Sequence, residues 1–84
     1  MTAIEPQVEI FTQPHCAPCR DIERFLRERN APFVLRDVAA DPQALETLAR
    51  AGFMVTPVTR IGERWIAGFR RQALLAALHE ASLP

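Results

Sequence analysis

Apolar positions recur along this chain with two different periods, and the changes of period divide it into seven elements. Three segments space apolar residues three and four apart, which is typical of amphipathic helices: residues 17–29, a segment from Pro42 that closes at Gly52, and residues 70–81. Four short runs are rich in β-branched and aromatic residues, which favours strands: residues 7–12, 33–38, 58–61 and 64–67. The predicted order is β-α-β-α-β-β-α.

Turn and capping residues support these boundaries. Asn30 suits a left-handed helix end, and Asp41 followed by proline is a typical helix start. Gly62 and Glu63 separate the last two strands by two residues, as in a hairpin. The pattern therefore predicts a parallel βαβ unit in the first half of the chain. In the second half it predicts an antiparallel hairpin with a covering helix.

The same patterns predict which side chains form the core. We expect Ile22, Phe25 and Leu26 to be buried on the first helix, Leu45 and Leu48 on the second, and Leu74, Leu75 and Leu78 on the third. Phe11 is expected in the core, whereas Phe69 follows a glycine turn and could be buried or exposed. The charged residues of the first helix are interpreted as a solvated face: Arg20, Asp21, Glu23, Arg24, Arg27 and Glu28.

Length and charge limit the possible functions. Eighty-four residues predict one domain over residues 1–84, and 49% hydrophobic residues can supply its core. Ten arginines balance ten acidic residues, so the chain offers no charged surface for nucleic acid or an anionic membrane. Residues 1–10 lack a signal-peptide pattern, and no apolar run could span a bilayer. We therefore expect a cytoplasmic monomer.

Cys16 and Cys19 lie where the first strand gives way to the first helix, separated by two residues. This spacing allows the two sulfurs to bond. Unpaired amides at a helix start favour a thiolate, so we expect the pKa of Cys16 to lie below the free value of about 8.5. Arg20 adds positive charge nearby. Cys19, nearly one turn later, is expected to be buried and protonated until it reacts.

The cysteine pair has three other interpretations: a zinc site, a structural disulfide and two unrelated core thiols. A zinc site would need ligands such as His15 or His79, whose spacing does not match the usual pattern. A purely structural disulfide over four residues removes little chain entropy, and two unrelated core thiols are a third possibility. His15 is itself expected to be an exposed loop residue. A C-x-x-C pair in a βαβ context favours a dithiol–disulfide oxidoreductase, with a non-catalytic adaptor as the alternative of another class.

A second motif places Thr56 and Pro57 at the start of the third strand. Proline is tolerated at a strand start because no ladder hydrogen bond is lost there. The peptide bond before it could be cis, or the proline could be an ordinary trans residue.

The segments IFTQPHCAPC, AGFMVTPV and RIGERWIAGFRRQALLAAL together resemble the glutaredoxin branch of the thioredoxin superfamily. The resemblance implies a thioredoxin-like α/β fold, with a four-stranded mixed sheet flanked by three helices and a cis bond before Pro57. It implies that Cys16 attacks and Cys19 resolves, with no tightly bound cofactor or metal. It also implies a set of substrate contacts: Thr12, Gln13, Thr56, Pro57, Gly68, Phe69 and Arg70.

The likeness also bears on the electron donor. Glutathione-dependent glutaredoxins usually have C-P-Y-C, a lysine near the position of Gln13, and acidic residues where this chain has Arg70 and Arg71. The stretch from Trp65 resembles the W-x-G-F-R signature of NrdH-type redoxins, although Trp65 stands one position too early, which would turn its ring to the other face of a strand. This resemblance implies thioredoxin reductase as donor and ribonucleotide reductase as acceptor, with a glutathione-dependent glutaredoxin as the alternative.

Overall fold

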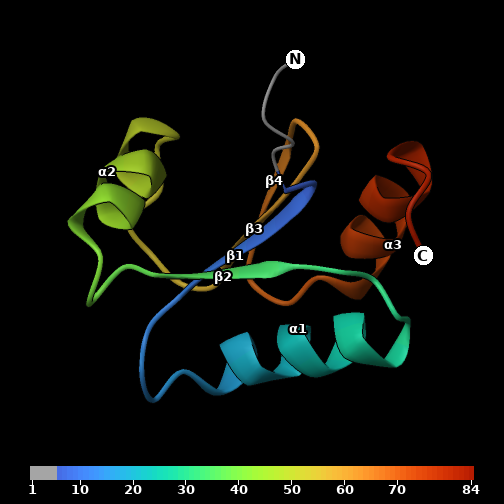
Figure 1. Ribbon diagram of the computed structural model, residues 1–84, viewed down its shortest axis with the longest axis horizontal. Helices are drawn as coiled ribbons and strands as arrows, with labels where there is room; N and C mark the ends of the chain where they lie inside the picture. The colour runs from blue at the N-terminus through green and yellow to red at the C-terminus, as the bar shows by residue number, and fades with distance from the viewer. Residues whose placement is uncertain (1–5) are drawn as a thin grey trace.

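The computed structural model describes residues 6–84, which form one mixed sheet with helices on both faces (Figure 1). The elements are β1 (Val8–Thr12), α1 (Ala17–Glu28), β2 (Val34–Asp37), α2 (Pro42–Arg50), β3 (Val58–Ile61), β4 (Arg64–Ala67) and α3 (Arg71–Glu80). The strands lie in the order β2-β1-β3-β4; β1 pairs with β2 in parallel, and the other two pairs are antiparallel. The predicted fold class and element order are confirmed.

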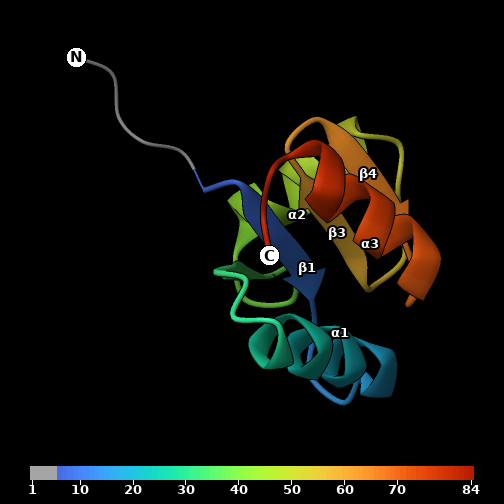
Figure 2. The same ribbon diagram turned by 90° about the vertical axis from the view of Figure 1, so that its right-hand side faces the viewer.

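The central strand β1 is buried on both faces because helices cover each side of it. Val8 and Ile10 pack into a cluster with residues of α1 and α3, whereas Phe11 packs with Ala44 and Leu48 of α2 on the opposite face. Figure 1 shows α2 and α3 on opposite sides of the strands, and Figure 2 shows α3 lying across β3 and β4. The active-site cysteines follow directly from the end of this buried strand.

The predicted caps and turns are present. Asp41 accepts a hydrogen bond from the backbone N–H of Gln43 at 2.9 Å, and Pro42 opens α2. Asn30 adopts a φ of 59° just after α1, the left-handed conformation that its position predicted. Gly62 stands in the β3–β4 turn with a φ of 60°.

Two core expectations are wrong. Leu45 is 45% exposed, because α2 meets the sheet through Ala44 and Leu48, four residues apart, and Leu45 is turned about 100° away from that line. Glu23 was assigned to a solvated face but is only 9% exposed, because it lies on the stripe of α1 that packs toward the sheet.

The aromatic side chains differ in burial and in the face of the sheet on which they pack. Phe11 is fully buried, whereas Phe69 is 40% exposed. Trp65 stacks on Phe11 and Phe53 on the α2 face, with ring centroids 5.5 and 6.0 Å away. Ile66, which stands two residues before the glycine, packs on the opposite face with α1 and α3. The one-residue shift of the tryptophan therefore has the effect expected for a strand.

Across residues 6–84, none of the helices combines the length and apolar character needed to cross a membrane. The expectation that residues 1–10 are not a signal peptide concerns a segment of which residues 1–5 lie outside the part of the chain that the structure describes.

Candidate active site

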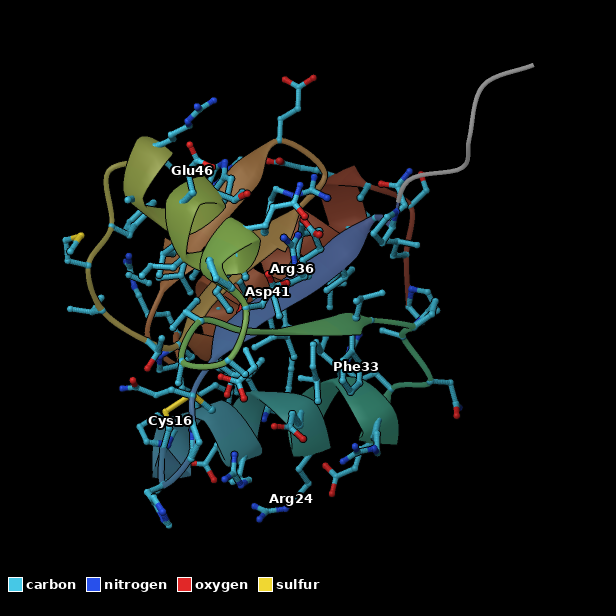
Figure 3. All side chains as sticks on the ribbon, turned by 60° about the vertical axis from the view of Figure 1, so that its left-hand side comes forward. Cys16, Arg24, Phe33, Arg36, Asp41 and Glu46 are labelled. Carbon is cyan, nitrogen blue, oxygen red and sulfur yellow. A yellow bond between two sulfur atoms is a disulfide. The ribbon has the colours of Figure 1, made fainter. Side chains whose placement is uncertain are left out.

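Cys16 and Cys19 form a disulfide at the amino-terminal end of α1, with their Cα atoms 5.3 Å apart (Figure 3). Cys16 is the N-cap residue of the helix, and Cys19 lies in its first turn. Cys16 retains 9% exposure, whereas Cys19 is fully buried. A partner can therefore reach only the first sulfur without a rearrangement of the helix.

A backbone amide of α1 contacts the sulfur of Cys16. The N–H of Cys19 donates a hydrogen bond to Sγ of Cys16 at 3.3 Å, so the side chain caps the helix. The first turn of α1 carries no acidic residue that would offset the positive end of the helix. When the disulfide is reduced, this arrangement favours the thiolate of Cys16.

Two segments distant in sequence complete the surroundings of the disulfide. The bond between Thr56 and Pro57 is cis, as the resemblance implied, and Oγ1 of Thr56 lies 3.9 Å from Sγ of Cys16. The carbonyl of Pro57 accepts a hydrogen bond from the N–H of Gly68 at 2.9 Å. Gly68 adopts a φ of 79°, which glycine reaches without strain. The tertiary structure thus brings four of the expected site residues together: Cys16, Thr56, Pro57 and Gly68.

An exposed apolar rim lies next to these residues. Met54 is 80% exposed and Val55 57% exposed, immediately before Thr56. Phe69, next to Gly68, packs edge-on against Phe25 of α1 with its ring centroid 5.9 Å away. Met54 and Val55 were not among the site residues expected from the sequence. The feature that could have indicated them is a pair of apolar residues in a stretch without helical or strand periodicity.

Arg70 and Arg71 stand at the start of α3. Arg70 is the N-cap residue and makes no side-chain capping bond, and both residues are exposed. The guanidinium of Arg71 lies over the ring of Phe25, 5.1 Å from its centroid. A hollow of about 200 Å³ separates this helix start from α1, lined by Asp21, Arg24, Phe25, Glu28, Phe69 and Arg71.

Thr12 and Gln13 line a different, larger cavity between β1, β2 and α1. It has a volume of about 370 Å³, and its other lining residues are Pro14, Arg20, Glu23, Leu35 and Asp37. Gln13 is exposed, whereas Thr12 is buried and its hydroxyl has no hydrogen-bond partner among residues 6–84. Thr56, Pro57 and Gly68 are not among the residues that line this cavity.

The chemistry available at this site is that of a dithiol. Among residues 6–84, no three side chains of His, Cys, Asp and Glu come close enough to hold a metal ion. His15, one residue before the disulfide, is exposed and has a φ of 62°. The site can exchange a disulfide for two thiols, with one accessible sulfur and one buried sulfur.

Comparisons with known proteins agree with this geometry. The family model for glutaredoxin matches residues 8–66. The glutaredoxin-like protein NrdH of Escherichia coli K12 is 31% identical over 75 residues, covering 89% of this chain and 91% of that protein. NrdH of Salmonella typhimurium is 32% identical over 63 residues, covering 75% of this chain and 78% of that protein.

Solved structures show the same likeness. The NrdH-redoxin structure from Escherichia coli superposes with a TM-score of 0.76 at 29% identity, covering 82% of this chain and 91% of that one. The thioredoxin-like protein BC3987 superposes with a TM-score of 0.81 at 32% identity, covering 84% of this chain and 99% of that one.

Proposed function

Because this chain belongs to the glutaredoxin family and is an NrdH-like thiol–disulfide oxidoreductase, we propose that it carries electrons from thioredoxin reductase to a protein disulfide. The choice of donor depends on the two arginines at the start of α3, Arg70 and Arg71. The NrdH-redoxin of Escherichia coli has a thioredoxin-like activity profile, which supports the same choice.

The proposed reaction has two steps. The thiolate of Cys16 attacks one sulfur of the partner disulfide, which forms a mixed disulfide and releases the other partner sulfur as a thiolate. Cys19 then attacks Sγ of Cys16, breaks the mixed disulfide and releases the second partner thiolate. The partner gains two electrons, and the protein is left with the Cys16–Cys19 disulfide. Thioredoxin reductase returns two electrons to that disulfide.

The surroundings of Cys16 suit an extended protein segment as partner. The backbone of Thr56 lies beside the disulfide and can pair with such a segment, while Pro57 and Gly68 fix its position. Met54, Val55 and Phe69 offer apolar contacts to this segment. The exposed Arg70 follows Phe69 directly in sequence. We propose a cytoplasmic monomer with a disulfide of ribonucleotide reductase as acceptor.

Glutathione is disfavoured as donor by charge. In glutathione-dependent glutaredoxins, acidic residues at the positions of Arg70 and Arg71 hold the ammonium group of glutathione, and two guanidiniums would repel it. Exposed charge pairs contribute up to about 1 kcal/mol each. Replacing attraction by repulsion at two positions should therefore cost roughly 1–3 kcal/mol, or about 5- to 150-fold in affinity.

The donor is tested by reducing the oxidised protein with NADPH and either thioredoxin reductase or glutathione together with glutathione reductase. We expect rapid reduction by thioredoxin reductase and poor reduction by glutathione. The double variant Arg70→Asp and Arg71→Asp should gain glutathione reduction by about 5- to 150-fold. As a control, Arg50→Asp with Arg64→Asp changes the net charge equally at other exposed sites. Efficient removal of glutathione from protein mixed disulfides by the unaltered protein would support a glutathione-dependent glutaredoxin instead.

The order of attack is tested by trapping. Cys19→Ser should accumulate a mixed disulfide with a protein substrate, because the attacking thiol remains and the resolving thiol is absent. Cys16→Ser should accumulate none. Equal trapping by both variants would contradict the two-step mechanism and the roles assigned to the two cysteines.

A further inference from the structure

Glu23 has a largely buried side chain, 12% exposed, whose carboxylate the proposed reaction does not yet use. It stands four residues after Cys19 on α1, so the two side chains occupy neighbouring positions on one face of the helix. That face packs toward the sheet, whereas Arg24 on the outer face points away from it (Figure 3). Cys19 is fully buried, and its thiol must lose a proton when it attacks Sγ of Cys16.

The carboxylate of Glu23 is available to accept that proton. Its oxygens lie 3.7 Å from Nη1 of Arg20 and 3.6 Å from Nη2 of Arg27, both beyond hydrogen-bond length. Both arginine side chains are more than half exposed, so their charges are largely solvated. No hydrogen bond to the Glu23 carboxylate occurs within the part of the chain that the structure describes.

A path for the proton lies beside Glu23. Its side chain lines the cavity of about 370 Å³ between α1 and the ends of β1 and β2. Thr12 lines the same cavity, and its buried hydroxyl has no hydrogen-bond partner in the described part of the chain. Thr12 alternates with Phe11 along β1, so its side chain faces α1, the helix that carries Cys19. The cavity opens to the surface, so water that enters it can connect the hydroxyl and the carboxylate with solvent.

We propose that Glu23 is the proton acceptor for Cys19 in the second step of the reaction. This inference rests on the proposed order of attack, in which Cys19 is the resolving thiol. The sulfur of Cys19 bonds to Sγ of Cys16, the bond from Cys16 to the partner breaks, and the partner leaves as a thiolate with both electrons. The proton of Cys19 passes to Glu23, directly or through the Thr12 hydroxyl and water, and from there to solvent. The other charged groups that face Glu23 are Arg20 and Arg27 on α1 and Asp37 at the end of β2.

The test separates the two steps with an aromatic disulfide that releases a coloured thiolate. Reduced protein should release one equivalent when Cys16 attacks and a second when Cys19 resolves the mixed disulfide. Glu23→Gln should leave the first phase unchanged and slow the second at pH 7 by about tenfold or more, since positioned general bases contribute that much or more. Glu28→Gln is the matched control, because it removes the same charge from an exposed position on the same helix.

The pH profile distinguishes a proton acceptor from a merely structural residue. In the unaltered protein, the second phase should depend less on pH between pH 6 and pH 8 than in the variant, because the proton of Cys19 passes to a positioned acceptor. In Glu23→Gln the rate should rise about tenfold per pH unit, since only the free thiolate of Cys19 then reacts. Parallel profiles for the two proteins, or equal slowing by Glu23→Gln and Glu28→Gln, would overturn the proposal.

A second measurement needs no variant and decides the matter if Glu23→Gln fails to fold. In reduced protein, the ¹³C signal of the Glu23 carboxyl carbon should show a step as the thiol of Cys19 titrates, and oxidised protein should show no such step. Absence of this step in reduced protein would also overturn the proposal. If the proposed order of attack is itself wrong, the trapping experiment shows it, because Cys19→Ser then fails to trap a mixed disulfide.

Discussion

Cys16 and Cys19 belong to one four-residue motif and yet have different surroundings. The sulfur of Cys16 caps α1, accepts the N–H of Cys19 and lies 3.9 Å from the hydroxyl of Thr56. Cys19 is one turn further on and has no exposed surface. The same helix that stabilises a charge on the first sulfur therefore hides the second sulfur from solvent.

This asymmetry predicts how the reduced protein reacts with an alkylating reagent. Cys16 should react first, and its rate should titrate with an apparent pKa below about 7.5, because the helix start favours its thiolate. The measurement is the rate of iodoacetamide labelling against pH, with the labelled residue identified by peptide mass. Earlier labelling of Cys19, or titration of both thiols near 8.5, would contradict the assignment of roles.

At the scale of elements, α2 contacts the sheet through fewer of its apolar positions than the sequence pattern suggests. Helix α2 has nine residues and buries Ala44 and Leu48 against Phe11 and Val58. Leu45 lies outside this contact. A short helix has room for one line of contact, so the leucines at 45 and 48 contribute unequally although the sequence shows both as apolar.

Alanine substitutions on α2 should reveal this inequality. Leu48→Ala removes a buried side chain and leaves a cavity, so it should lower the free energy of unfolding by about 2–4 kcal/mol. Leu45→Ala makes the same chemical change at an exposed site and should cost less than about 1 kcal/mol. Denaturant unfolding of both variants measures the difference. Equal losses would show that α2 packs through a different face.

At the scale of the whole molecule, a partly buried ionic network joins strands that are distant in sequence. Glu9 on β1 accepts hydrogen bonds from Nη1 of Arg36 on β2 and Nε of Arg60 on β3, each at 2.7 Å. Arg60 also donates to the carbonyl of Pro6 at 2.8 Å. Burial by itself would raise the pKa of Glu9, but the hydrogen bonds and charges of Arg60 and Arg36 outweigh burial and lower it.

The lowered pKa makes the stability of the fold depend on pH. Ionised Glu9 stabilises the folded protein above the unfolded-state pKa of about 4.3, and this contribution is lost as the pH falls through the lower folded-state pKa. Glu9→Gln should therefore lower the free energy of unfolding by about 1–3 kcal/mol at pH 7, and by less below pH 4.

Glu46→Gln is the matched control for that measurement. Glu46 pairs with Arg50 at 2.9 Å on the exposed face of α2, and such a pair contributes about 0.5 kcal/mol or less. Unfolding in denaturant at several pH values compares the two variants. A loss for Glu9→Gln that stays constant between pH 7 and pH 3 would contradict a role for the ionised carboxylate.

The sequence by itself determined the order of the elements, most of their boundaries and the place of the cysteine pair. These features depend on interactions within a few residues: apolar spacing in α1, the Asp41 cap of α2, the Gly62 turn, and the short link from β1 to Cys16. The roles of Thr56 and Gly68 were expected only through the family resemblance, because neither residue is near Cys16 in sequence.

Only the tertiary structure decided which residues surround the disulfide and which faces are buried. Pairing of β1 with β3 brings Thr56 to Cys16 across forty positions, and the β3–β4 hairpin brings Gly68 to Pro57. Glu23 is buried because α1 presents that side to β1 and β2, which an alternation of charges along a helix cannot reveal. Local patterns specify an element, whereas burial depends on what packs against it, and that packing is a property of the whole chain.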